Sequence, residues 1–391
     1  ELQRPDLLVD YGKNGLKDWD YADLMDCLKE IRGWALKNDA HMEISLSALT
    51  SLIDMRYPTF DKKRRSVLQM VNQTLDTMFR HFPSLAREDS KSRYRLIDWE
   101  TRQFFRGPSY EESVLIIDAS LFPPEGDNCD SRLLTEAFKR GWRRFIVFGL
   151  KGQRFHGCGL GPDSGGVRID IYGSSGDYIG SGIDGLSVYI HGNAQDQLGQ
   201  IMKSGKMVIY GDTGQTFMYG AKGGNVYVMG NAAGRPLINA VGKPKVVING
   251  TCLDYLGESF MAGDPFNEGG FVVLNGIEFD DMGNVRSQPT PYPGSNLFSL
   301  ASGGAVYVRD PFQMIDDQQL NGGEVVSLKE RDWDLILPYL RENESLFGIS
   351  IERDLLTVDG ISRDPLDVYR KVQPKKTVDV KIDGLEEWGE D

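Results

Sequence analysis

The sequence has few of the residues from which metal sites and nucleophilic sites are built. It contains four cysteines and four histidines in 391 residues. No CxxC pair occurs, and no histidine stands four positions from another ligand residue. This spacing argues against an iron–sulfur cluster or a zinc site held by this chain alone. We therefore expect free thiols at Cys27, Cys129, Cys158 and Cys252.

Long apolar runs and positive charge are also scarce. No segment approaches the ~20 apolar residues that a membrane span needs. The formal net charge of −13 argues against nucleic acids and anionic membranes as partners. The chain begins at Glu1 and shows no signal peptide. We expect a cytoplasmic protein of two or three domains, with sizeable cores from its 40% hydrophobic residues.

Glycine, by contrast, is abundant and regularly spaced. Six short aliphatic segments end in glycines that follow one another at 19, 19, 19, 20 and 26 residues. The positions two and four residues before each glycine are apolar throughout, as expected for strands with one face in a core. A repeat of this length is typical of stacked units that share a core. We interpret these glycines as structural: Gly173, Gly192, Gly211, Gly230, Gly250 and Gly276.

The repeat also predicts the fold class. We expect a mainly β chain, a single-stranded right-handed parallel β-helix of about seven coils, with an N-terminal α-helical region and a β-α-β cap. A period of 19 or 20 residues without a six-residue sub-period disfavours the hexapeptide class. A seventh copy, Val306 to Arg309, lacks the glycine. The residue directly before each glycine is variable, so this column, which includes His191, is expected to face outward.

Flanking segments predict the domain organisation. Apolar residues at helical spacing predict helices in residues 18–36, after an Asp cap, and in 61–81. Strand, helix and strand are expected at 114–119, 130–140 and 145–148, and a helix interrupted by Pro338 at 328–342. The predicted domains are a helical N-terminal domain or arm (1–112), the β-α-β cap (113–150), the β-helix (151–312) and a C-terminal helix with an extended tail that grips a neighbour (313–391).

Three segments carry a resemblance to a known family. They are FGLKGQRFHGCGLG, which starts at Phe148, the run from Gly192 to Asp212, and the run from Asn249 to Asp264. Together they resemble the GXGXG β-helix domain of glutamate synthases, both the C-terminal domain of the large bacterial subunit and the stand-alone archaeal form. The β-helix component of formylmethanofuran dehydrogenase is more distantly similar. The likeness extends from near Val114 to about Arg309.

The resemblance implies a domain without catalytic, cofactor-binding or metal-binding residues of its own. In glutamate synthases the glutaminase, FMN and iron–sulfur chemistry belongs to other domains. We therefore expect a non-catalytic scaffold subunit that holds FMN/iron–sulfur and glutaminase-type subunits in register, with the cofactors in those partners. Two alternatives remain: a subunit of a formylmethanofuran-dehydrogenase-type or other redox complex, and an autonomous polysaccharide-active enzyme, which needs clustered carboxylates with Arg or Lys on adjacent coils.

A few individual residues are candidates for an interface or a functional role. His156 is the strongest, with Arg154 and Cys158 beside it in the glycine-rich run; the alternative for His156 is to satisfy carbonyls of that loop. The repeating Asp177, Asp196 and Asp254 are expected to cap turns rather than to bind calcium.

Overall fold

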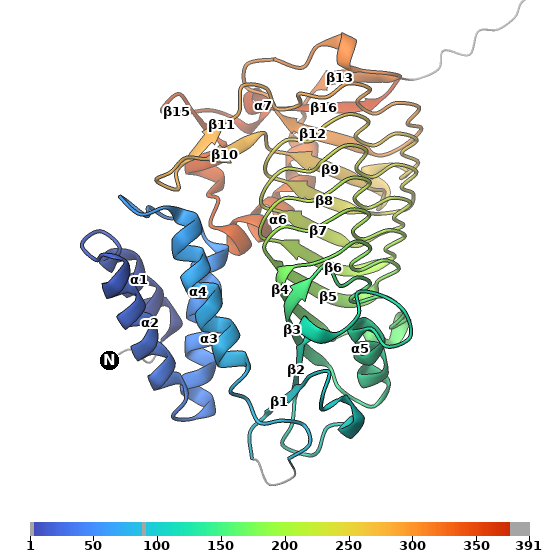
Figure 1. Cartoon of the computed structure of the whole chain (residues 1–391). Helices are drawn as coiled ribbons and strands as arrows, with labels where there is room; N and C mark the ends of the chain where they lie inside the picture. Colours follow the sequence, from blue (N-terminus) through green and yellow to red (C-terminus); the bar gives the residue numbers. More distant parts are fainter. Residues whose placement is uncertain (1–3, 88–90, 376–391) are drawn as a thin grey trace, which may run out of the picture.

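The computed structural model describes residues 4–87 and 91–375, and these form an α/β fold (Figure 1). Within them, twelve strands form one sheet, in the order β1-β2-β3-β4-β5-β6-β7-β8-β9-β12-β16-β13. Neighbours are parallel as far as β12, and β16 is antiparallel to both β12 and β13. The strands of this sheet are β1 (Tyr94–Ile97), β2 (Val114–Asp118), β3 (Arg144–Lys151), β4 (Arg168–Ser174), β5 (Asp184–His191), β6 (Ser204–Ile209), β7 (Asn225–Val228), β8 (Lys245–Ile248), β9 (Phe271–Leu274), β12 (Ala305–Arg309), β13 (Gly323–Ser327) and β16 (Tyr369–Pro374).

Helices come before and after the repeats in the chain. They are α1 (Pro5–Gly15), α2 (Tyr21–Ala35), α3 (Asp39–Asp54), α4 (Arg64–Phe79), α5 (Asp130–Lys139), α6 (Glu330–Phe347) and α7 (Pro365–Val368). Two small antiparallel pairs complete the described strands: β10 (Ile277–Phe279) with β11 (Val285–Ser287), and β14 (Thr357–Val358) with β15 (Ile361–Ser362). In the described ranges, no helix combines the length and the apolar character needed to cross a membrane.

The predicted fold class, a mainly β chain built as a single-stranded right-handed parallel β-helix, is wrong. The structure is an α/β fold with a twelve-stranded, mostly parallel sheet flanked by helices. Each repeat contributes one regular strand to the sheet, while its return half consists of turns with only isolated bridges, such as Ala232 with Cys252. The sheet also extends beyond the repeats at both ends, and helices of the same chain cover its second face.

The predicted stacking of the aliphatic columns is confirmed. Ile190 is in register with Ile171 on one side and with Ile209 on the other, and Ile209 is in register with Val228. All four side chains are fully buried in one core cluster. The seventh copy is β12, which pairs in parallel with β9. Alternate aliphatic residues therefore fill a common interior, as the pattern predicts.

The return halves are joined by a second set of backbone hydrogen bonds. In one repeat the N–H groups of Gln197, Gly199 and Ile201 donate to Gln215, Ile179 and Tyr219 carbonyls at 2.8, 2.8 and 2.9 Å. The three donors have φ between 57° and 64°. The N–H groups of Gln197 and Ile201 point to the following repeat, and the N–H of Gly199 points to the preceding one. The pattern recurs one repeat later at residues 216, 218 and 220.

Turn carboxylates link the same halves. Asp196 accepts a hydrogen bond from the Gln215 N–H at 2.8 Å, and Asp254 accepts one from the Ser295 N–H at 2.7 Å. These carboxylates therefore fix backbone N–H groups in the turns of the following repeat, as the turn-capping prediction expects.

The column predicted to face outward is buried instead. Helices α3 and α4 cover the first strands, where Ile146, Phe148 and Tyr172 belong to the core cluster of the helical region. Helix α6 covers the later strands, where Met229 and Asn249 of this column are buried. Figure 1 shows the N-terminal helices along one side of the stacked strands. The outward prediction failed because both flanking segments fold back onto the sheet.

At the N-terminal side, the predicted helices and the β-α-β unit are present as α2, α4, β2, α5 and β3. Asp20 caps α2, accepting from the Ala22 and Asp23 N–H groups. The β-α-β unit does not end the sheet, because β1 pairs in parallel with β2 beyond it.

At the C-terminal side, two expectations need correction. Helix α6 runs unbroken through Pro338, held by buried Ile336 and Leu340, which pack against the sheet on both sides of the missing N–H. The predicted extended tail contains β16, which inserts between β12 and β13 of its own sheet instead of reaching a neighbour. The rest of that tail, 376–391, lies outside the described residues.

Candidate functional site

The three candidate residues Arg154, His156 and Cys158 lie together in the loop that follows β3. They occupy different environments there. Arg154 is partly exposed and forms ion pairs with Glu125 at 3.0 Å and with Asp177 at 3.3 Å. It therefore joins the segment before α5 to the turn of the next repeat.

His156 is fully buried against the start of α5. Its Nε2 lies 2.7 Å from Oδ2 of Asp130, the first residue of that helix, and neither side chain is exposed. Among the described residues, the remaining polar atoms of the pair, His156 Nδ1 and Asp130 Oδ1, have no hydrogen-bond partner. The pair fastens α5 to the first repeat.

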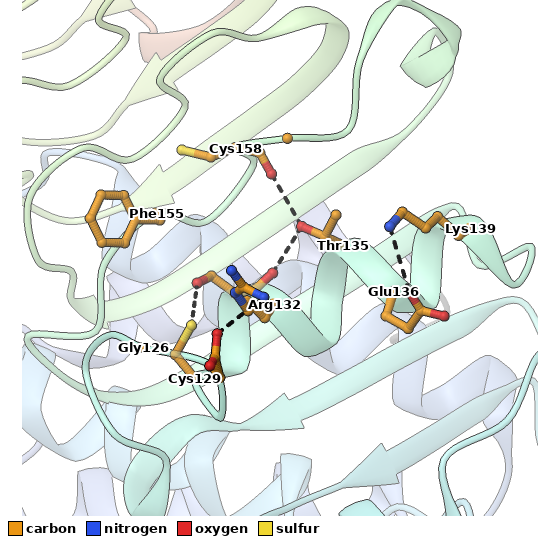
Figure 2. Close-up of a pocket in the computed structure, with 11 residues that line it drawn as sticks. Gly126, Cys129, Arg132, Thr135, Glu136, Lys139, Phe155 and Cys158 are labelled. Carbon is orange, nitrogen blue, oxygen red and sulfur yellow. Dashed lines mark hydrogen bonds and ion pairs between the residues drawn. The ribbon is translucent and has the colours of Figure 1, made fainter.

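Cys158 lines a pocket of about 540 Å³ between α5 and the first repeat (Figure 2). Its Sγ donates to the Tyr178 carbonyl at 3.2 Å, and burial raises the pKa of this thiol to about 11. A thiol with that pKa is protonated at neutral pH and is a poor nucleophile. All four cysteines are free, as the sequence predicts.

The other walls of this pocket are polar but internally paired. Figure 2 shows the Thr135 hydroxyl joined to the Cys158 carbonyl, a contact of 3.1 Å. Arg132 pairs with Asp127 at 3.3 Å, and Lys139 pairs with Glu136 at 3.6 Å. The charged side chains around this pocket are thus balanced by one another within the chain.

The repeat glycines allow close contact between successive repeats. A Cβ atom on Gly230 would lie 2.1 Å from Oδ1 of Asp212, and one on Gly250 would lie 2.3 Å from Oδ1 of Asn231. Those two oxygens accept hydrogen bonds from the next repeat, at the N–H groups of Asn231 and Thr251. The glycine thus leaves room for the side chain that links one repeat to the next.

A buried ionisable cluster that the sequence analysis missed lies on the covered face of the sheet. His191, from β5, places Nδ1 2.8 Å from Oδ2 of Asp54 in α3. Its Nε2 lies 3.3 Å from Oδ1 of Asp170 in β4. Arg168 completes the cluster with bonds of 2.7 and 2.9 Å to the two oxygens of Asp170.

The pKa values of this cluster follow from burial and from the paired charges. Burial lowers the pKa of His191, but Asp54 and Asp170 outweigh it and raise the value to about 9. Burial raises the pKa of Asp170, yet the hydrogen bonds from His191 and Arg168 hold it at about 2. Burial keeps the pKa of Asp54 above its usual range despite His191. At neutral pH a charged imidazolium therefore bridges the helical region and the sheet.

One sequence signal could have revealed that this face is covered. The residue three positions before each repeat glycine, on the face opposite the aliphatic columns, is Tyr or Val in every repeat after the first, and from the third repeat onward it is fully buried. These residues are Val208, Tyr227, Val247 and Val273, and all are buried against other elements. Strands that are apolar on both faces indicate a sheet covered on both sides.

No group of three or more His, Cys, Asp or Glu side chains within residues 4–87 and 91–375 has the geometry to hold a metal ion.

Comparison with known proteins places the repeats in a family. Residues 147–358 match the family described as the GXGXG motif. The chain is also 37% identical over 206 residues to Uncharacterized protein MJ1350 of Methanocaldococcus jannaschii, an alignment that covers 51% of this chain and 72% of that protein. The family match and this alignment agree with the glycine-ended repeats seen in the sequence and in the structure. The chain therefore belongs to the GXGXG motif family.

Proposed function

We propose that this chain is a non-catalytic scaffold subunit of a glutamate-synthase-like flavin and iron–sulfur oxidoreductase. Membership of the GXGXG motif family is consistent with a glutamate-synthase-like domain. In this proposal, FMN and iron–sulfur clusters are bound by partner subunits, which also include a glutaminase-type protein.

The observation that carries the proposal is that the reactive side chains fasten parts of this chain to one another. His156 binds α5 through Asp130, and His191 binds α3 through Asp54. A buried amide pair, Asn249 with Asn343, joins β8 to α6 with reciprocal bonds of 2.8 and 2.9 Å. Side chains that bond one part of the chain to another in this way support a rigid body, and a scaffold has to be rigid.

The surface offers apolar side chains for partner subunits. On the return halves of the repeats, Ile201 is 44% exposed, Met261 48% and Leu300 71%. The region near α5 exposes Leu121 and Tyr110. In the proposal, the exposed apolar side chains of the return halves contribute to the contact with partner subunits.

The alternatives differ in what they need. A formylmethanofuran-dehydrogenase-type complex keeps the scaffold role and changes only the partners. An autonomous polysaccharide-active enzyme needs clustered carboxylates with Arg or Lys on adjacent coils, whereas the exposed Asp196 and Asp254 each accept a backbone hydrogen bond from the next repeat. That arrangement favours the scaffold over the hydrolase or lyase.

Co-expression with the proteins encoded beside its gene tests the proposal. We expect a stable complex by native mass spectrometry that contains FMN and iron, and glutamine-dependent glutamate formation that requires this chain. The purified chain alone should carry no flavin and degrade no polysaccharide. Bound flavin on the isolated chain, or hydrolase or lyase activity from it, would contradict the scaffold role. A redox complex without glutamate synthesis would favour the first alternative.

A further inference from the structure

A second cavity, of about 400 Å³, lies between α3 and the covered face of β3, β4 and β5. We refer to it as the helix–sheet pocket. Its walls include Ser47 and Ser51 from α3, Tyr94 from β1, and Arg144 and Arg168 from β3 and β4. Its volume is in the range of pockets that bind small molecules.

Two guanidinium groups stand side by side in this pocket. Arg144 and Arg168 are register partners on adjacent parallel strands, so their side chains emerge from the same face about 4.8 Å apart. Arg168 is neutralised by its hydrogen bonds to both carboxylate oxygens of Asp170. Like charges at this spacing repel each other unless each is balanced.

The charge of the Arg144 guanidinium is not balanced in this way. Its buried Nε has no hydrogen-bond partner among the described residues. The carboxylates that line the pocket are engaged elsewhere: Asp54 and Asp170 hold His191, and Glu43 pairs with Arg93 at 3.2 Å. A buried donor on a cation without a partner is costly, and an anion in the pocket would remove that cost.

We propose that the helix–sheet pocket binds a small organic anion whose carboxylate or phosphate group contacts Arg144. A guanidinium presents paired N–H donors that match the two oxygens of either group. The hydroxyls of Ser47 and Ser51 line the opposite wall and can donate to the same ligand. Because the pocket is formed by α3 on one side and by the sheet on the other, the ligand also holds the helical region to the sheet.

Isothermal titration of the purified full chain, at constant ionic strength set with chloride, tests this proposal. The probes are inorganic phosphate, succinate and phosphoglycerate. We expect saturable binding of at least one probe, weakened tenfold or more in Arg144→Met and also weakened in Arg144→Lys, which keeps the charge but loses the paired donors. Arg65→Met, at an exposed arginine of α4, should bind like the unmodified chain.

Hydrogen exchange places the ligand. The bound probe should slow amide exchange in Asp39–Asp54, the α3 segment, and should not do so in Arg144→Met. Phosphate binding without succinate binding would identify a phosphate ligand, and the reverse a carboxylate ligand; both support the proposal. No saturable binding of any probe, or equal weakening by Arg144→Met and Arg65→Met, would overturn it. Circular dichroism of each variant verifies that it is folded.

Discussion

The imidazole Nδ1 of His191 lies 2.8 Å from Oδ2 of Asp54, although 137 positions separate the two residues in the sequence. His191 belongs to β5 and Asp54 to the last position of α3. This contact joins the helical region to the sheet at a buried point, and Tyr172 adds a second contact through its 2.8 Å hydrogen bond with Thr50. The helical region is therefore part of the same folded body as the repeats.

Replacing His191 should weaken that junction strongly. In His191→Gln, Asp54 and Asp170 would face each other without the imidazolium, and loss of one partner from a buried charge cluster costs on the order of 3–5 kcal/mol. Urea unfolding followed by tryptophan fluorescence measures the change in the free energy of unfolding. His81→Gln, at an exposed histidine of the same region, is the control and should change it by less than about 0.5 kcal/mol. Equal effects of the two substitutions would contradict the bridging role.

The same bridge makes stability depend on pH. The pKa of His191 is about 9 in the folded protein against 6.5 for an ordinary histidine, because Asp54 and Asp170 outweigh its burial. The folded state therefore holds this proton more tightly than the unfolded state does. Its stabilisation is complete below pH 6.5 and is lost as the pH rises through about 9, on the order of 3 kcal/mol in all.

Urea titrations between pH 6 and pH 10 measure that loss. Burial raises the pKa of the neighbouring Tyr172 and Tyr210 hydroxyls, so these groups stay neutral across the range. The His191→Gln variant should show a flatter profile than the unmodified chain. Parallel profiles for the two proteins would show that another group causes the pH dependence.

Gly230→Ala should destabilise the stack of repeats. The new Cβ would lie 2.1 Å from Oδ1 of Asp212, which accepts a 2.7 Å hydrogen bond from the Asn231 N–H. We expect a loss of at least about 2 kcal/mol in the free energy of unfolding, since a side chain has to move away from a tight contact.

Gly33→Ala is expected to have the opposite effect on the stability of the same chain. A Cβ at this exposed glycine of α2 meets nothing within 4 Å. Alanine should stabilise the helix there by about 0.5–1 kcal/mol. Thermal unfolding of both variants measures the pair, and a Gly230→Ala protein as stable as Gly33→Ala would refute the close-contact explanation.

Asn343→Ala tests the junction between α6 and the sheet. Asn343 and Asn249 are fully buried and bond to each other in both directions. Removal of Asn343 leaves one N–H of the Asn249 amide without its partner, while the bonds of Asn249 to Val228 and Asn275 remain. We expect a loss of about 1–3 kcal/mol. Asn321→Ala, at an exposed residue that donates to Asn296, should cost less than about 0.5 kcal/mol.

The double substitution Asn249→Ala with Asn343→Ala isolates the pair. Because each single variant already breaks both hydrogen bonds of the pair, the double variant should lose less than the sum of the two single losses. Strict additivity in chemical unfolding would mean that the two amides do not act together.

The sequence pattern predicts well which residues fill the interior shared by the repeats. It predicts poorly the opposite face of the sheet, which the helices cover. Ile171, Ile190 and Ile209 follow from period and alternation alone, because every repeat has the same requirement at those positions. The cover depends on contacts between segments far apart in the chain, such as Asp54 with His191, and no local rule specifies them. The incorrect fold class has the same origin: a repeat describes its own unit, and the helices on the sheet are not repeated.

The candidate site shows the same division. The glycine-rich run drew attention to His156 and Cys158, and the structure does place them at one junction with α5. Their roles depend on the contact with Asp130 and on burial, and the spacing of residues in the sequence predicts neither. Helix α3 went unpredicted, and with it both the bridge to His191 and the helix–sheet pocket.

The most direct test of the scaffold account measures two quantities on the co-expressed complex: the amount of complex assembled, and the turnover per assembled complex. The substitutions are Arg154→Ala, Cys158→Ser and Leu300→Asp, at two candidate residues and one exposed apolar position. The account predicts that such changes lower assembly, most of all at Leu300, and leave turnover per assembled complex unchanged. A fully assembled complex in which Arg154→Ala or Cys158→Ser abolishes turnover would contradict it.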